Sequence, residues 1–174
     1  MKVILETPRL LLREMTPADL DFMAEMLGDE EVMRYYPKTE DRAGAAANIQ
    51  RQIDRYAAWG YGPWLVENRE TRAPIGRVGL LRQEIEGIQE VEVGYMIHRP
   101  FWRQGFAFEA ASASRNYAFS TLGRERVISL VRPENIPSQA VARKMGMQPE
   151  RELIHWDLRH LVFAMTRPAK LMTS

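Results

Sequence analysis

A strand, a helix and a second strand follow one another directly in the middle of this chain. The run Glu90 to Ile97 is typical of a strand, Gly105 to Leu122 carries apolar residues at helical spacing, and Val127 to Val131 is a second β-type run. Two strands joined through a helix lie parallel in one sheet, because the helix must pack back onto that sheet. The chain is therefore predicted to adopt an α/β fold whose sheet contains a parallel pair.

Further β-type runs surround this unit and place it inside a larger sheet. They are Val3 to Leu5, Arg9 to Arg13, Trp64 to Asn68, Ile75 to Leu81, Glu150 to Trp156 and Leu161 to Thr166. The runs from Trp64 to Ile97 are typical of an antiparallel meander. Because no repeat or low-complexity tract divides the chain, we expect one domain over residues 1–174, a twisted mixed β-sheet flanked by helices.

Three other helices are expected from their start and stop signals. Thr16-Pro17-Ala18-Asp19 combines a capping threonine, a proline at the first helical position and an acidic residue at the capping-box position, and this helix should end at Gly28. A second helix is expected from Thr39 to Gly60, and a short one from Pro137 to Met145. The second should bury an apolar stripe and expose its arginines: Ala43, Ala46, Ala47, Ile53, Tyr56 and Ala57 inside, and Arg42, Arg51 and Arg55 outside.

The charge balance narrows the function classes. The chain has 24 basic and 23 acidic side chains and a net charge of +1, which argues against a dedicated nucleic-acid binder. It contains no cysteine, so disulfides, thiolate nucleophiles and thiolate metal sites are excluded. His155, Asp157 and His160 match no known ligand spacing, and no metal is expected.

No membrane segment is expected either. The longest charge-free stretch, Tyr56 to Val66, is interrupted by glycines and a proline and is far shorter than the roughly 20 residues of a membrane-spanning helix. Glu6 interrupts the N-terminus before the apolar core of a signal peptide can form, which indicates a cytoplasmic protein.

The start of the helix at Gly105 is a candidate anion site. Backbone N–H groups in the first turn of a helix lack internal partners, and the helix dipole adds positive potential there. Gly105 and Ala107 leave room for a phosphate group to approach. Neither G-x-x-x-x-G-K-[ST] nor G-x-G-x-x-G occurs in the chain, which excludes the usual triphosphate and dinucleotide loops.

The residues around this site resemble those of a known family. Glu92-Val93-Gly94-Tyr95, followed by Phe101-Trp102-Arg103-Gln104-Gly105-Phe106-Ala107-Phe108-Glu109-Ala110, resembles the acyl-CoA-binding motif of the GNAT superfamily of N-acetyltransferases. The similarity is to the branch that contains ribosomal-protein-alanine N-acetyltransferases. Asn135, Ser138 and Lys144 to Met147 resemble a second motif of that branch, and Thr7 to Arg13 resembles its first strand.

The resemblance implies an acetyl-CoA site between the two parallel strands. In the family these strands splay apart after a bulge, so backbone groups near Met96 and Ile97 are expected to pair with pantetheine and to polarise the thioester carbonyl. Asn135 and Ser138 are expected to hold the same arm of the cofactor. The pyrophosphate is expected on Arg103, Gln104, Gly105, Phe106 and Ala107, where Arg103 and Gln104 replace the usual Gly and Lys.

The resemblance also implies two catalytic residues. Glu92 is the expected general base, acting through water on the attacking amine. Its rivals are Glu84, Glu86 and Glu90. Ser138 is the expected partner of the departing sulfur, because no tyrosine occurs between Pro133 and Gly146; alternatively it only caps the short helix.

The acceptor pocket is expected near the second helix, where Tyr35, Tyr36 and Trp64 are candidate lining residues and core packing is the alternative. The sequence predicts transfer of an acetyl group from acetyl-CoA to a primary amine of a protein N-terminus or a small molecule by direct attack. A non-catalytic acyl-CoA-binding sensor or interaction module is the alternative, favoured by Arg103 and by Ser138 in place of a tyrosine. Edge strands allow a homodimer, although no residue demands one.

Overall fold

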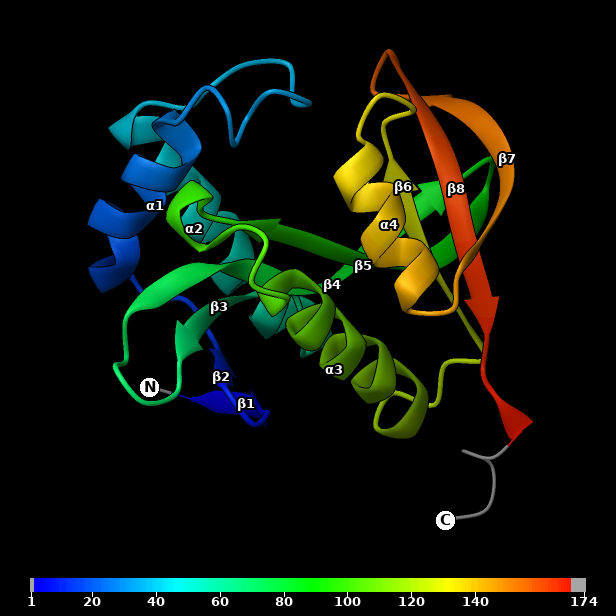
Figure 1. Ribbon diagram of the computed structural model, residues 1–174, viewed down its shortest axis with the longest axis horizontal. Helices are drawn as coiled ribbons and strands as arrows, with labels where there is room; N and C mark the ends of the chain where they lie inside the picture. Colours follow the sequence, from blue (N-terminus) through cyan, green and yellow to red (C-terminus); the bar gives the residue numbers. More distant parts are fainter. Residues whose placement is uncertain (1, 170–174) are drawn as a thin grey trace.

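An eight-stranded mixed sheet organises the computed structural model, which describes residues 2–169 (Figure 1). The strand order is β1-β2-β3-β4-β5-β6-β8-β7. The strands are β1 (Val3–Glu6), β2 (Leu10–Arg13), β3 (Pro63–Asn68), β4 (Pro74–Ile85), β5 (Ile88–Ile97), β6 (Arg126–Val131), β7 (Gln148–His155) and β8 (Leu158–Thr166). Neighbours are antiparallel except β5 and β6, which run parallel. The predicted meander and parallel pair are thus confirmed.

Helices cover both faces of this sheet. They are α1 (Leu20–Gly28), α2 (Arg42–Trp59), α3 (Phe106–Ser120) and α4 (Ile136–Lys144), with the 3-10 turns η1 (Pro17–Asp19) and η2 (Arg99–Phe101). Figure 1 shows α1 and α2 beside the N-terminal half of the sheet and α4 beside the C-terminal half. No helix within residues 2–169 is both long enough and apolar enough to cross a membrane.

Alternation along β3 separates two hydrophobic cores. Trp64 and Val66 belong to the core that includes Phe119 of α3, whereas Leu65 between them belongs to the core that includes Met23 of α1. The sheet therefore buries both of its faces in this half of the molecule. This confirms the expected arrangement of a mixed sheet with helices on both sides.

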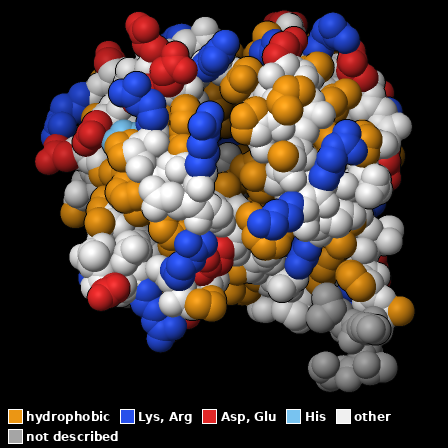
Figure 2. Space-filling view, viewed as in Figure 1, with side chains coloured by type: hydrophobic (Ala, Val, Ile, Leu, Met, Phe, Trp, Pro, Cys, Tyr) orange, Lys and Arg blue, Asp and Glu red, His pale blue; other side chains and the backbone are white. Residues whose placement is uncertain are grey.

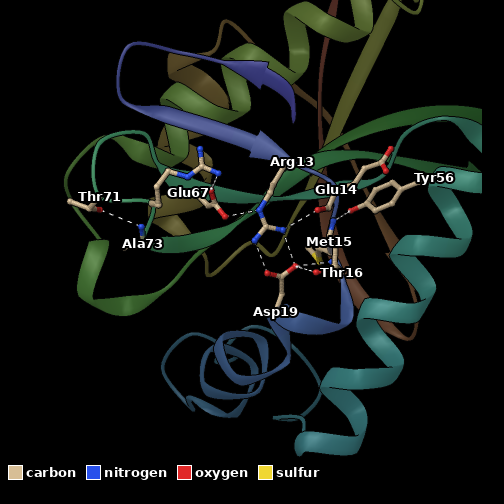
Figure 3. Close-up of polar contacts among 10 residues, drawn as sticks. Arg13, Glu14, Met15, Thr16, Asp19, Tyr56, Glu67, Thr71 and Ala73 are labelled. Atoms are coloured by element: carbon tan, nitrogen blue, oxygen red, sulfur yellow. Dashed lines mark hydrogen bonds and ion pairs between the residues drawn. The ribbon is translucent and has the colours of Figure 1, made fainter. Parts of the chain in front are cut away.

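A buried ion cluster ties β2 to η1 and β3 (Figure 3). Arg13 contacts the carboxylates of Asp19 and Glu67, each at 2.6 Å, and all three side chains are at most 8% exposed. Asp19 also accepts from the backbone N–H of Thr16 at 2.7 Å, as the predicted helix start requires. Burial raises the pKa of Asp19, but hydrogen bonds from Arg13 and Thr16 outweigh burial and hold that pKa below its ordinary value.

The helix α2 begins later than expected and turns a different side inward. Its cap is Asp41, which accepts from the N–H of Gly44 at 2.8 Å, and not Thr39. The buried residues are Ala45, Asn48, Ile49 and Gln52, whereas the predicted Ala43, Ala46, Ala47 and Ala57 are exposed. Alanine gains little from burial, so a stripe of alanines is a weak guide to the inner face. Ile53 and Tyr56 are partly buried, as expected.

Candidate active site

The strands β5 and β6 separate at the level of Val93. Their parallel pairing is limited to Glu92 opposite Ile128. The Val93 carbonyl then accepts the Ser129 hydroxyl at 2.7 Å, in place of the next backbone N–H of β6. Figure 2 shows a cleft between the part of the molecule that bears α1 and α2 and the part that bears α4. The separation of β5 from β6 lies at this cleft.

The gap receives backbone groups from alternate residues of β5. The His98 N–H donates to β4 at 2.9 Å, and the alternation of an antiparallel pair then turns the backbone of Met96 toward β4 as well. Tyr95 and Ile97 consequently direct their backbone groups toward the gap. The Ile97 carbonyl accepts from Trp102 Nε1 at 2.6 Å, which fixes the following loop against the end of the strand.

The bulge expected in β5 is absent from the described strand. Its pairing with β4 continues without a register shift from Ile88 to Ile97. The strands part instead because side chains, including the Ser129 hydroxyl, take over the hydrogen bonds of the parallel ladder. Met96 turns its side chain into the core beneath α1 and α2. Its backbone pairs with β4 and does not face the gap, contrary to the expectation that it would pair with pantetheine.

Glu92 lies at the point where the strands part. Its carboxylate accepts from Gln83 Nε2 at 2.6 Å and lies in hydrogen-bonding range of the Leu130 backbone N–H on β6. Burial raises the pKa of Glu92, although Gln83, Leu130 and the positive charge of Arg55 all act in the opposite direction. A carboxylate held in this way is a stronger base than an exposed one.

The three rival glutamates lie in other surroundings. Glu84 is exposed and accepts from Gln89 at 2.9 Å. Glu86 pairs with Arg151 at 3.1 Å, and Glu90 pairs with Arg126 at 3.1 Å. Of the four candidates, Glu92 is the one that is half-buried without an ion pair and lies where the strands part.

Ser138 does not cap α4, because Asn135 fills that role. The side chain of Asn135 accepts from the Ser138 backbone N–H at 3.2 Å. The Ser138 hydroxyl instead donates to the Tyr95 hydroxyl at 3.2 Å, which donates to the Ser138 carbonyl at 2.7 Å. Burial raises the pKa of Tyr95. β5 thus supplies the tyrosine hydroxyl that the segment from Pro133 to Gly146 lacks, and Tyr95 was already present in the motif that carried the resemblance.

The loop before α3 has the geometry expected of an anion site. Arg103 and Gly105 adopt left-handed backbone angles, with φ of 60° and 80°, and Gly105 is the N-cap. The residues Trp102, Arg103, Gln104 and Gly105 are all exposed. Phe106 is buried and anchors the start of the helix, while Ala107 behind it is half-buried.

The turn between β1 and β2 holds this loop in place. The Glu109 carboxylate accepts from the Thr7 hydroxyl at 2.6 Å, the Arg9 backbone N–H at 3.0 Å and Arg9 Nε at 2.6 Å. Arg9 also donates to the Gln104 carbonyl at 2.9 Å. A hollow of about 600 Å³ beside the loop is lined by residues that include Arg9, Gly105 and Lys144.

Beneath α2, on the face of the sheet that carries Glu92, lies a group of polar side chains that the sequence did not predict. Arg77 of β4 lies directly opposite Met96 and donates to Asn48 of α2 at 2.7 Å. The Tyr36 hydroxyl lies in hydrogen-bonding range of Arg77. Arg55, expected to be solvated, is half-buried and donates to Gln52 at 2.8 Å. The signal for Arg77 was its place as the one charged residue in the otherwise apolar run from Ile75 to Leu81.

Of the three aromatic candidates for the acceptor pocket, Tyr36 lies beside this polar group and Tyr35 is half-buried next to it in the chain. The prediction for Trp64 is wrong. Trp64 is fully buried in the core on the α3 side. It packs edge-on against the Tyr117 ring, with the two ring centroids 5.4 Å apart. The strand alternation of β3 turns its side chain away from α2.

The site thus combines two separated parallel strands, a helix that begins at their open end and a half-buried carboxylate where they part, within an α/β fold. The model of the acetyltransferase (GNAT) domain matches residues 9–148, and the chain belongs to this family. The chain is 35% identical over 149 residues to the N-acetyltransferase YoaA of Bacillus subtilis, covering 84% of each. It is 31% identical over 157 residues to the protein YkkB of the same organism, covering 90% of this chain and 91% of YkkB.

Solved structures show the same fold. An acetyltransferase from Agrobacterium tumefaciens superposes with a TM-score of 0.81 at 26% identity, covering 94% of each chain. RimL, a ribosomal alpha-N-protein acetyltransferase crystallised with coenzyme A, superposes with a TM-score of 0.77 at 15% identity, covering 95% of this chain and 98% of that one. Ribosomal-protein acetyltransferases are thus among the proteins that share this fold.

Proposed function

We propose that this enzyme transfers the acetyl group of acetyl-CoA to a primary amine of a protein N-terminus or a small molecule by direct attack, within one domain over residues 1–174. The observation that carries the proposal is the place of Glu92. Its half-buried carboxylate lies where β5 and β6 part, on the face of the sheet that also carries Arg77 beneath α2.

The residues around the gap suit acetyl-CoA. Backbone N–H groups of Tyr95 and Ile97 point toward it and match the amide groups of pantetheine. The exposed loop from Trp102 to Gly105, with the start of α3, suits a pyrophosphate. Ser138 of α4 contacts Tyr95 of β5 at the gap, and Asn135 caps the same helix. Lys144 lines the hollow beside the loop, where it suits a further phosphate. Acetyl-CoA supplies the acetyl group as a thioester.

The chain provides a base and an acid for the proton transfers. Glu92 accepts the proton of the attacking amine, directly or through one water, and is held for this by Gln83. Tyr95 holds a proton for the departing sulfur, and Ser138 orients the Tyr95 hydroxyl by donating to it. An N–H of Tyr95 or Ile97 polarises the thioester carbonyl. The Tyr95 hydroxyl also removes one reason for the sensor alternative, which rested in part on a missing tyrosine.

Thermal unfolding with acetyl-CoA, CoA and ATP tests the proposal first. A ligand at 100 times its dissociation constant stabilises a protein by about 2.7 kcal/mol, so acetyl-CoA should raise Tm and ATP should not. CoA release is then measured with a thiol reagent against a panel of amines; the chain itself has no cysteine to react. A Tm increase with no CoA release from any amine would favour the sensor, and no increase would refute the acetyl-CoA site.

A further inference from the structure

Three arginines lie near one another on the α2 side of Glu92. Arg77 comes from β4, whereas Arg51 and Arg55 come from α2. Arg77 pairs in register with Met96, and side chains directly opposite in an antiparallel pair share one face of the sheet. Glu92 precedes Met96 by four residues on β5, so its side chain is on that same face. We call Arg51, Arg55 and Arg77 the guanidinium cluster.

The two half-buried members of the guanidinium cluster, Arg77 and Arg55, have neutral partners. Arg77 donates to the Asn48 side chain at 2.7 Å and lies beside the Tyr36 hydroxyl. Arg55 donates to the Gln52 side chain at 2.8 Å. In the described part of the chain, no carboxylate lies within ion-pairing distance of the cluster. Arg13, by contrast, is buried and has two carboxylates at 2.6 Å.

Half-buried guanidiniums without an anion are costly, because each loses part of its hydration and is repelled by neighbouring positive charges. The pKa of Arg77 is lowered by burial and by the charge of Arg51, and the pKa of Arg55 is lowered by burial and by Arg77 and Arg51. Glu92 is the carboxylate within electrostatic range, but Gln83 already holds it for another role. The cluster therefore offers a binding site for an anionic group from a ligand.

We propose that the acceptor is a small primary amine that carries a carboxylate, bound with its carboxylate on Arg77 and Arg55 and its amine toward Glu92. The proposal rests on the proposed acetyltransferase function and narrows its acceptor. The amine nitrogen forms the new N–C bond, the C–S bond of the thioester breaks, one amine proton passes to Glu92, and the sulfur is protonated to the free thiol of CoA.

This arrangement selects against other amines. A polyamine or a peptide with a basic first residue would bring positive charge against the guanidinium cluster, where repulsion in a partly buried site is strong. An amine whose carboxylate is converted to a carboxamide keeps its nucleophile but leaves the arginines without an anion. Because the carboxylate makes charge-assisted hydrogen bonds to arginine and the carboxamide does not, kcat/KM should be about 10- to 100-fold higher for the amine that carries the carboxylate.

The test compares a pool of the standard α-amino acids with a pool of their carboxamides and with spermidine, measuring CoA release. The variants are Arg77→Gln and Arg55→Gln, with Arg42→Gln as the matched control, because Arg42 is an exposed arginine of α2 that pairs with Asp21. Wild type and Arg42→Gln should prefer the amino acids by about 10- to 100-fold. Arg77→Gln should lose this preference mainly through a higher KM, with kcat less affected.

A binding measurement separates the possible failures. N-acetylated amino acids, the products, should raise the Tm of wild type in the presence of CoA and leave that of Arg77→Gln unchanged. Equal or faster reaction of carboxamides or spermidine would overturn the proposal, as would no reaction with any pool while acetyl-CoA still raises Tm. No Tm increase with acetyl-CoA itself would refute the proposed function instead. A Tm increase by acetyl-CoA in Arg77→Gln shows that the variant is folded.

Discussion

Gln83 Nε2 donates to the Glu92 carboxylate at 2.6 Å across β4 and β5. Gln83 is itself buried, with an exposed fraction of 7%, so the amide is held by the strand and fixes the carboxylate in one position. The contact also favours the charged form of Glu92, whereas burial favours the neutral form. The proposed role of Glu92 as the base makes activity sensitive to this balance, and the raised pKa makes stability sensitive to it as well.

Glu92→Gln should lower turnover by about 10²- to 10⁴-fold, because the amide cannot accept the proton of the amine. The Tm increase caused by acetyl-CoA should remain, since the exposed loop from Trp102 to Gly105 and the backbone of β5 are unchanged. Steady-state kinetics and thermal unfolding measure the two effects. Turnover equal to that of wild type would remove Glu92 from the role of base.

The same variant should be at least as stable as wild type at neutral pH. Burial raises the pKa of Glu92 above its ordinary value of 4.5, so the native state binds this proton more tightly than the unfolded state does. The stabilisation of the native state by this proton is complete below the pKa of Glu92 in the unfolded state. It is lost as the pH rises through the pKa of Glu92 in the folded state. Denaturant unfolding at several pH values tests this sign; a large loss of stability in Glu92→Gln at pH 7 would contradict it.

Gln83→Met should shift the acidic limb of the pH–activity profile to higher pH. The methionine fills a similar volume but removes the donor that lowers the pKa of Glu92, so a higher pH is needed to form the active carboxylate. Gln89→Met is the control, because Gln89 is exposed and contacts Arg82 and Glu84 instead. An unchanged or lower limb in Gln83→Met would show that Gln83 does not tune the base.

The parts of the fold that were predicted from the sequence depend on local signals. Glycines with positive φ end α2 and begin α3 where expected, at Gly60 and Gly105. Runs of β-type residues between turn signals placed the strands. The inner side of α2 was missed because Asn48 and Gln52 are buried by partners from elsewhere in the chain, including Arg77.

The candidate site was predicted only where a continuous motif carried it. Glu92 and the loop to Ala107 belong to one such stretch. The pairing of Tyr95 with Ser138 joins residues 43 positions apart, and that of Arg9 with Glu109 joins residues 100 apart. No local sequence pattern predicts such contacts, because they depend on how the strands and helices pack. The parting of β5 from β6 without a bulge likewise follows from side-chain contacts and not from chain periodicity.

Tyr95→Phe should lower turnover by about 100-fold if its hydroxyl protonates the departing sulfur. The stability cost should be about 1 kcal/mol, because the Ser138 carbonyl loses one hydrogen bond. Ser138→Ala should have a smaller effect on turnover, since it removes the donor to Tyr95 but leaves the acid. A larger loss of turnover in Ser138→Ala than in Tyr95→Phe would reverse the two roles.

Glu109→Gln should weaken acetyl-CoA binding by about 5- to 10-fold, the equivalent of one hydrogen bond. In this variant Arg9 loses the ion pair that holds it against the exposed loop from Trp102 to Gly105. Hydrogen bonds from Thr7 and Arg9 outweigh burial and hold the pKa of Glu109 below its ordinary value. Its contribution to stability is therefore present above that value and lost as the pH falls. Titration calorimetry with acetyl-CoA measures the affinity, with Glu70→Gln in an exposed turn as the control. Equal affinity in the two variants would show that the loop holds its shape without Arg9.

Asp19→Asn should destabilise the protein by about 3 to 5 kcal/mol, because removing one carboxylate leaves Arg13 buried with Glu67 alone. Asp21→Asn provides the control: Asp21 is 86% exposed and pairs with Arg42, which is 64% exposed, so its loss should cost less than about 1 kcal/mol. The pKa of Asp19 lies below its ordinary value of 3.8, so its stabilising effect is complete above that value and is lost as the pH falls through the folded pKa. Wild type should therefore lose stability in acid more steeply than Asp19→Asn does. Parallel acid profiles for the two proteins would show that the cluster contributes through packing rather than charge.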